Sequence, residues 1–127
     1  MQTPYELLGG EEGVERLVER FYAYMDTLPE VSTIRAMHQT DLGPMIEKLA
    51  VFLVSWMGGP QRYNERFGRV IIPLAHRPFA IGPSERDAWL LCMRRALEDS
   101  EAKPELVRLL MKAFYGMADM CRTDDSR

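Results

Sequence analysis

Apolar residues recur at intervals of three and four along most of the chain, which is the spacing of amphipathic helices. The clearest case lies between residues 14 and 25, where one face is apolar and the other carries glutamate and arginine. The apolar positions are Val14, Leu17, Val18, Phe21, Tyr22 and Met25. A similar stripe through Met45, Leu49, Phe52, Leu53 and Trp56 predicts another long helix.

Local signals set the ends of these helices. Thr3, Pro4 and Glu6 form a capping box with proline in the first turn, and Gly9-Gly10 breaks the helix that they begin. A turn at Pro29 precedes a short helix in the sequence LPEVSTIRAMH. The long helix that follows begins at Asp41 or Gly43, and Gly58-Gly59-Pro60 ends it.

Two further helices finish the chain. One spans about 84–99 and is expected to bury Trp89, Cys92, Met93 and Ala96. The other starts at Pro104 and is expected to bury Leu106, Leu109, Leu110, Ala113, Phe114 and Met117. The segment 60–83 lies between the helix that ends at Gly58-Gly59-Pro60 and the helix of about 84–99. It holds four prolines, which favours a loop with short helical turns. No segment alternates with a period of two, so the predicted fold class is all-α.

Composition narrows the range of functions. A chain of 127 residues, 46% hydrophobic and 28% charged, predicts one globular domain over residues 1–127. The net charge of −3 gives no reason to expect nucleic acid as a partner. The most apolar run, LAVFLVSWM, is too short to span a membrane, and no export signal opens the chain. Cys92 and Cys121 are expected to be free thiols in a reducing cytoplasm.

The chain has only two histidines, and one of them stands in an unusual setting. His76 lies in PLAHRPFAIG, between Pro73 and Pro78, with Leu74, Phe79 and Ile81 nearby. The plain interpretation is a half-buried histidine bonded to a carbonyl. Two cysteines and two histidines cannot form a usual zinc cluster, so any metal must bring most of its ligands. A haem does so, because its iron needs one protein imidazole beside four porphyrin nitrogens.

A haem pocket also needs a second wall with a few polar groups. Tyr22 lies on the buried stripe of its helix, Trp89 lies on the inward face of another, and His38 follows the short helix. Singly, Tyr22 and Trp89 are ordinary core aromatics whose polar tips find backbone partners. Together with His76 they predict donors that face a ligand on the far side of the iron.

Several motifs in this order resemble the group II truncated haemoglobins, the bacterial two-over-two globins. They are PYELLGG, RFYAYMD, MH followed by DL, EKLAVFLVSWMGGP, RFG, HRPFAIG and ERDAWLLCM, and they cover about residues 3–97. The resemblance implies a two-over-two helical sandwich around haem, with a largely loop-like proximal segment. Departures stand at Arg69-Val70, where the family often has His-Pro, and at Ala75, where it often has arginine.

The resemblance also implies roles for particular residues. His76 becomes the proximal iron ligand, and Tyr22, His38 and Trp89 become the groups that stabilise the distal ligand. No firm catalytic residue is implied. The residues expected around the haem, including Lys48 and Arg77 as partners of the propionates, are His76, Met45, Lys48, Leu49, Phe52, Phe67, Ile72, Arg77, Phe79, Ile81 and Trp89.

Three functions remain open at this point. The first is reversible binding of O2, CO, NO or similar ligands by haem b, held non-covalently because the chain has no C-x-x-C-H motif. The second is a redox haem enzyme, either an NO dioxygenase or a peroxidase-type detoxification enzyme, served by a reductase. The proximal turn has no acid to charge His76, which ranks this second. The third is a haem-free helical interaction module.

Overall fold

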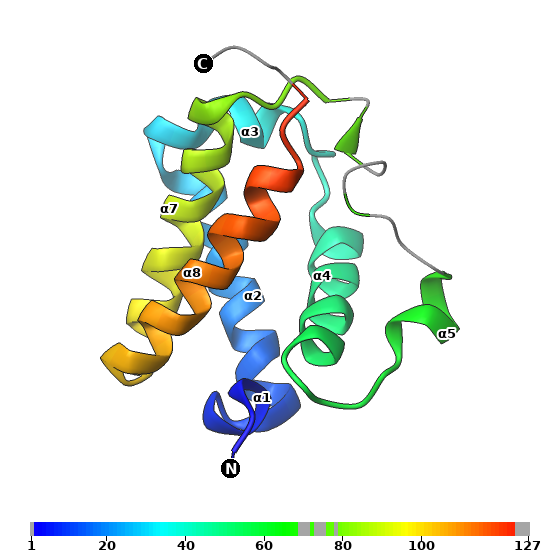
Figure 1. The fold of residues 1–127 in the computed structure, drawn as a ribbon. Coiled ribbons are helices and arrows are strands. Elements are labelled where there is room, and N and C mark those ends of the chain that lie inside the picture. The colour runs from blue at the N-terminus through cyan, green and yellow to red at the C-terminus, as the bar shows by residue number, and fades with distance from the viewer. Residues whose placement is uncertain (1, 69–71, 73–75, 78, 124–127) are drawn as a thin grey trace.

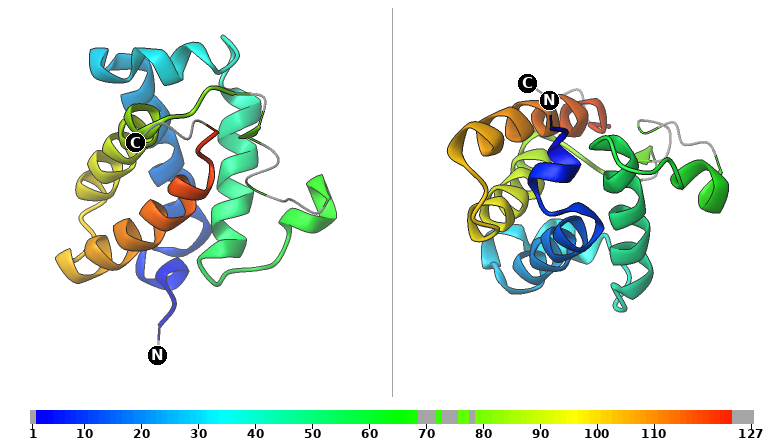
Figure 2. Two further views of the ribbon diagram at one scale, coloured as in Figure 1. Left: turned by 45° about the horizontal axis from the view of Figure 1, so that its top comes forward. Right: turned by 90° about the horizontal axis from the view of Figure 1, so that it is seen from below.

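The computed structural model describes residues 2–68, 72, 76–77 and 79–123 (Figure 1). None of these residues lies in a β-strand, which confirms the all-α prediction. The longest elements are α2 (Gly10–Thr27), α4 (Gly43–Trp56), α7 (Pro83–Asp99) and α8 (Pro104–Met120). α2 packs against both α4 and α7, and α7 forms an antiparallel hairpin with α8. The turned views keep α2 between α7 and α4 (Figure 2).

The start of the chain follows its local signals. α1 (Pro4–Leu7) has the predicted capping box: the Glu6 amide donates to Thr3 Oγ1 at 3.2 Å, and the Thr3 amide donates to Glu6 Oε1 at 3.0 Å. Gly9 and Gly10 then adopt left-handed backbone angles, with φ of 102° and 73°. Only glycine takes such angles without strain, so the pair turns the chain sharply into α2.

Short elements connect α2 to α4 and follow α4. η1 (Pro29–Val31) and α3 (Ser32–Ala36) form the predicted turn and short helix. α4 begins at Gly43, whose amide donates to Asp41 Oδ1 at 2.9 Å. After α4, Gly58 has a φ of 99°, and the segment beyond it contains α5 (Tyr63–Phe67). The predicted ends of the third long helix are therefore confirmed.

The core forms where α2, α4 and α7 meet, and it extends to α8. The predicted apolar face of α2 is buried along its whole length, since Val14, Leu17, Val18 and Phe21 are fully inaccessible to solvent. From α7, Cys92 and Met93 are equally buried, and Phe114 is their counterpart on α8. Burial of apolar surface on this scale is the main stabilising contribution to such a fold.

Three residues of α8 differ from the expectation, of which Met117 is half-buried. Leu109 is 59% exposed and Ala113 is also exposed, although the sequence pattern predicts that both are buried. The reason is that the apolar face of α8 is wider than the surface that the neighbouring helices cover. The buried, inward-facing positions are Leu106, Leu110 and Phe114. The expected loop around His76 falls partly outside the described residues, because these omit 69–71, 73–75 and 78.

Candidate ligand-binding site

Tyr22 and His38 form the first part of the site. Tyr22 projects from α2 and is only 4% exposed, whereas His38, which follows α3, is half-buried. Their rings meet edge to face with centroids 5.9 Å apart. The structure therefore brings together two side chains that are 16 positions apart in the sequence and that the sequence predicts to lie near a ligand.

The hydrogen bond of His38 defines which ring nitrogen is free. Nδ1 lies 2.8 Å from the carbonyl oxygen of Ile34, one helical turn earlier. A carbonyl oxygen only accepts, so Nδ1 carries the proton and donates. In the neutral ring, Nε2 then carries the lone pair. Neutral His38 therefore accepts a hydrogen bond at Nε2, and it becomes a second donor only when the ring is charged.

The Tyr22 hydroxyl is the main buried donor of this region. Burial raises the pKa of Tyr22 from 10 to about 12, so the hydroxyl keeps its proton throughout the neutral range. No described residue accepts a hydrogen bond from it. Among the described residues, no fully enclosed side-chain oxygen or nitrogen lacks a hydrogen-bond partner, so the Tyr22 oxygen is not fully enclosed. The proton is thus left for a group beyond these residues, such as solvent or a ligand.

Trp89 stands one ring away from this pair. Its indole packs on Phe21, with centroids 5.0 Å apart, and on Phe114 of α8, at 5.6 Å. Phe21 in turn meets the Tyr22 ring edge to face at 4.9 Å. Phe21 therefore contacts the rings of both predicted donors, and the sequence pattern placed it in the core alone. Trp89 is half-buried, and its N–H has no acceptor among the described residues.

His76 presents one nitrogen in the same way as His38. Its Nδ1 lies 2.8 Å from the carbonyl oxygen of Ile72, and the ring is half-buried. Nδ1 is accordingly the protonated nitrogen, and Nε2 has its lone pair free for a metal ion. The amide of Phe79 donates to the carbonyl oxygen of His76 at 3.0 Å, which closes the turn after the histidine.

The expected haem contacts on α4 and beyond are distributed unevenly. Met45, Leu49 and Phe52 are half-buried at helical spacing on one side of α4. Lys48 is exposed on the same helix, with Nζ 5.7 Å from the centroid of the Phe67 ring. Phe67, Arg77 and Phe79 are exposed, whereas Ile72 and Ile81 are half-buried. The described contacts therefore group the α4 residues, but they do not join them to Arg77 or Phe79.

A hollow of about 190 Å³ opens beside Phe52. Its polar lining is already engaged in local bonds: Ser55 Oγ accepts from the amides of Arg62 and Tyr63, and Gln61 Nε2 donates to two backbone carbonyls. The bonds of Ser55 and Gln61 close the turn after α4, so these two lining side chains are already engaged within the protein.

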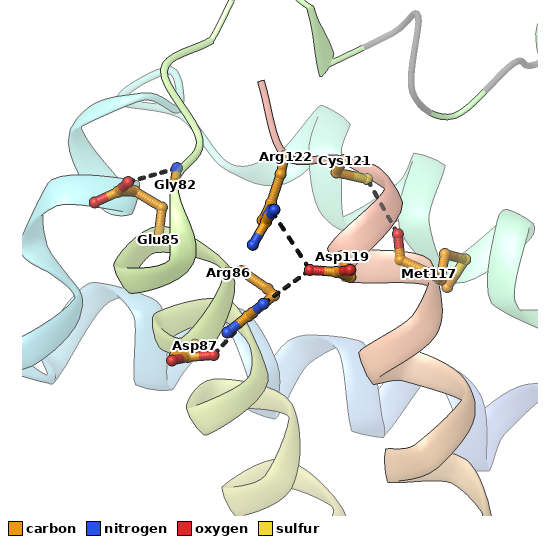
Figure 3. A network of polar contacts seen from close by, with 8 residues as sticks. All are labelled: Gly82, Glu85, Arg86, Asp87, Met117, Asp119, Cys121 and Arg122. Atoms are coloured by element: carbon orange, nitrogen blue, oxygen red, sulfur yellow. Dashed lines mark hydrogen bonds and ion pairs between the residues drawn. The ribbon is translucent and has the colours of Figure 1, made fainter. Parts of the chain in front are cut away.

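A polar network at the end of α8 was not predicted from the sequence (Figure 3). The Arg86 guanidinium contacts Asp119 at 2.8 Å and Asp87 at 2.9 Å, and Arg122 contacts Asp119 at 3.5 Å. The hydrogen bond from Arg86 lowers the pKa of Asp119. The network joins the start of α7 to the end of α8. Arg86 and Asp119 are 33 positions apart, and the periodicity of the sequence gives no sign that they pair.

These residues fit a haem. An imidazole with Nε2 free supplies the single protein ligand that a haem iron requires, and half-buried apolar side chains on α4 suit a flat porphyrin. On the α2 side, a buried hydroxyl with no described acceptor suits a small ligand. A helical fold with a half-buried histidine and a buried aromatic wall has the features that a globin-type haem site requires.

Comparison with known proteins agrees. The family model for bacterial-like globins matches residues 3–123, so the chain belongs to the bacterial-like globin family. The group 2 truncated haemoglobin YjbI of Bacillus subtilis is 33% identical over 108 residues, which are 85% of this chain and 79% of that protein. The predicted resemblance to the group II truncated haemoglobins is thereby confirmed.

Solved structures give the same result. A cold-adapted truncated haemoglobin from the Antarctic bacterium Pseudoalteromonas haloplanktis has a TM-score of 0.94 and 32% identity, covering 97% of this chain and 99% of that one. A group II 2-on-2 haemoglobin from Agrobacterium tumefaciens has a TM-score of 0.91 and 37% identity, covering 96% and 95%. The family implies a haem cofactor and small diatomic ligands such as O2. No helix in the described part is long and apolar enough to cross a membrane.

Proposed function

We propose that this globin binds haem b non-covalently through His76 and binds O2 and other diatomic ligands reversibly. The observation that carries the proposal is the setting of His76: its Nδ1 lies 2.8 Å from the Ile72 carbonyl oxygen, which leaves Nε2 free, and its ring is half-buried in a turn that the Phe79 amide closes. A ferrous haem held there by His76 would supply an iron that binds diatomic molecules. Both cysteines are free, which supports a reducing cytoplasmic setting.

Tyr22 is the proposed principal donor on the distal side. Its raised pKa of about 12 keeps the hydroxyl protonated, and its rotation allows it to donate either to a polar ligand or to His38 Nε2. Neutral His38 therefore acts as an acceptor that orients the Tyr22 hydroxyl. Trp89 is the second proposed donor, held rigidly between Phe21 and Phe114.

The haem itself is proposed to lie against the half-buried side of α4, where Met45, Leu49 and Phe52 supply apolar contact. Phe67, Ile72, Phe79 and Ile81 complete the proposed apolar surroundings. Lys48 and Arg77 are exposed, as groups that pair with propionates at the edge of a pocket would be. Such exposed pairs are worth about 0–1 kcal/mol each, so neither is required for haem binding.

The acceptor of His76 Nδ1 bears on the alternative of a redox enzyme. A carboxylate in this position would increase the electron donation of the imidazole, which favours peroxidase chemistry. Here the acceptor is a neutral backbone carbonyl. This observation supports reversible ligand binding above a peroxidase-type function, and leaves NO dioxygenation with a partner reductase as the second candidate.

Spectra of two histidine variants test the proposal. His76→Ala should lose most of its haem, or show a ferrous spectrum without an imidazole ligand that added imidazole restores. His38→Ala is the matched control, because His38 makes the same bond to a carbonyl one turn earlier, and it should keep the imidazole-ligated ferrous spectrum. An unchanged ferrous spectrum in His76→Ala, or loss of ligation in His38→Ala alone, would refute the assignment.

A further inference from the structure

Thr123, just beyond α8, makes three hydrogen bonds to the segment that follows His76. Its hydroxyl donates to the carbonyl oxygen of Phe79 and accepts from the amide of Ile81 at 2.8 Å. Its own amide donates to the Ile81 carbonyl at 2.9 Å. The Thr123 side chain thus bonds to Ile81 and Phe79, which lie 42 and 44 positions away, and no sequence motif predicts these contacts.

These bonds continue to the histidine. Phe79, whose carbonyl Thr123 holds, donates its own amide to the carbonyl oxygen of His76 at 3.0 Å. His76 Nδ1 is fixed in turn by the Ile72 carbonyl. The position of the imidazole therefore depends on a continuous series of hydrogen bonds that ends at Thr123.

Apolar packing holds the first two residues of this segment only weakly. Phe79 is 40% exposed and Ala80 is exposed as well. The next polar contact is the capping bond of α7, in which the Gly82 amide donates to Glu85 Oε1 at 2.7 Å. Hydrogen bonds from Thr123 and Glu85 thus restrain residues 79–82, together with the burial of Gly82 and the partial burial of Ile81.

The other end of the contact is firmly anchored. Asp119, at the end of α8, is held by Arg86 of α7 and by Arg122, the residue before Thr123 (Figure 3). The Arg122 amide also donates to the Asp119 carbonyl at 3.2 Å. The backbone that presents Thr123 is therefore fixed to α7, which gives the hydroxyl a defined place from which to hold Phe79 and Ile81.

We infer that Thr123 is a positioning residue for the iron ligand: its hydroxyl fastens the segment 79–81 to the end of α8 and so sets the place of the His76 imidazole. This inference rests on the proposed function, because it takes His76 to be the ligand. Removing the hydroxyl should loosen the histidine turn while the helical core, which Thr123 does not enter, stays intact.

Amide exchange tests the clamp directly on the protein as isolated. Thr123→Val keeps the shape and removes both hydroxyl bonds, so the Ile81 amide should exchange roughly tenfold faster or more. Thr123→Ser keeps the hydroxyl and should restore exchange to within about twofold. Thr27→Val is the matched control, because its hydroxyl bonds only to Ala23 within α2. Wild-type exchange of Ile81 in Thr123→Val would overturn the clamp.

The positioning role needs a second measurement on the haem-loaded protein. In Thr123→Val the iron–histidine stretching band of the ferrous form should shift or broaden, and haem should pass to an excess of apomyoglobin roughly two- to tenfold faster, as expected for one or two lost hydrogen bonds. Thr123→Ser should restore both. An unchanged band and rate, beside a band that still depends on His76, would refute the positioning role alone. A band that does not depend on His76 would refute the proposed function itself.

Discussion

The buried hydroxyl of Tyr22 predicts a specific change in stability at alkaline pH. Its pKa is raised by burial from 10 to about 12, whereas in the unfolded chain the phenol titrates at its ordinary value. Below pH 10 both states keep the proton, so the hydroxyl adds no pH dependence. Between pH 10 and 12 the unfolded state loses the proton first, and the free energy of unfolding falls as the pH rises.

The size of the effect follows from the shift. One pKa unit corresponds to about 1.4 kcal/mol, so a shift from 10 to about 12 costs the folded state about 2 kcal/mol at pH 12, where the folded phenol is half ionised, and approaches about 3 kcal/mol above that pH. Tyr22→Phe keeps the ring contacts with Phe21 and removes only the titrating group. Because no described residue bonds the hydroxyl, its removal at neutral pH should change stability by no more than about 1 kcal/mol. As the pH rises above 10, the variant should gain stability relative to the wild type, by about 2 kcal/mol at pH 12.

Urea unfolding of both proteins across this pH range measures the difference. Cys92, whose pKa burial raises from 9 to about 11, destabilises both proteins alike, so it cancels in the comparison. Tyr115→Phe is the matched control, because Tyr115 is 48% exposed and its removal should leave the wild-type profile unchanged. Parallel curves for wild type and Tyr22→Phe up to pH 12 would show that the hydroxyl is not buried as described.

Two further predictions concern the distal donors and the junction of α1 and α2. Tyr22→Phe and Trp89→Phe should each raise the O2 dissociation rate, measured by stopped-flow displacement, roughly two- to tenfold, and should change the CO dissociation rate much less. The effects of the two substitutions should be non-additive in the double variant. Equal changes for O2 and CO would show that the substitutions change steric access to the site instead of a hydrogen bond. Gly13→Ala should destabilise the protein by about 1–3 kcal/mol or more in urea unfolding, because the new Cβ would lie 1.8 Å from the Leu8 carbonyl oxygen. Gly116→Ala is the control: this position on α8 has open space around it, so the substitution should stabilise the protein by about 0.5–1 kcal/mol. Stabilisation by both alanines would contradict the close packing at Gly13.

Most of the fold could be predicted because it depends on local signals. The capping box at Thr3, the glycine pair at 9–10 and the apolar stripe of α2 each act over a few residues, and each appears in the structure as expected. The same local reasoning was wrong at Leu109 and Ala113. Periodicity shows that a face is apolar, but how much of that face is covered depends on the size and placement of α7 and the core.

The site was less predictable for a similar reason. That Tyr22 and His38 meet depends on how α2 and α3 pack, and Phe21 between Tyr22 and Trp89 is a consequence of the same packing. The contacts of Thr123 span more than forty residues and involve backbone atoms, which every residue carries. Such contacts leave no trace in residue type, so only the folded chain shows them.

The two histidines share one local arrangement. His38 follows Ile34 by four residues and His76 follows Ile72 by four, which is the spacing of one helical turn. In both cases Nδ1 bonds the carbonyl one turn earlier and Nε2 is presented. The bond alone therefore does not distinguish an iron ligand from its distal neighbour. The surroundings separate them: the His38 ring meets the Tyr22 ring edge to face, whereas His76 precedes a segment that Thr123 bonds to the end of α8. A histidine whose lone pair has a donor beside it is suited to orient a hydrogen bond, and one held by its backbone with that nitrogen free is suited to bind a metal.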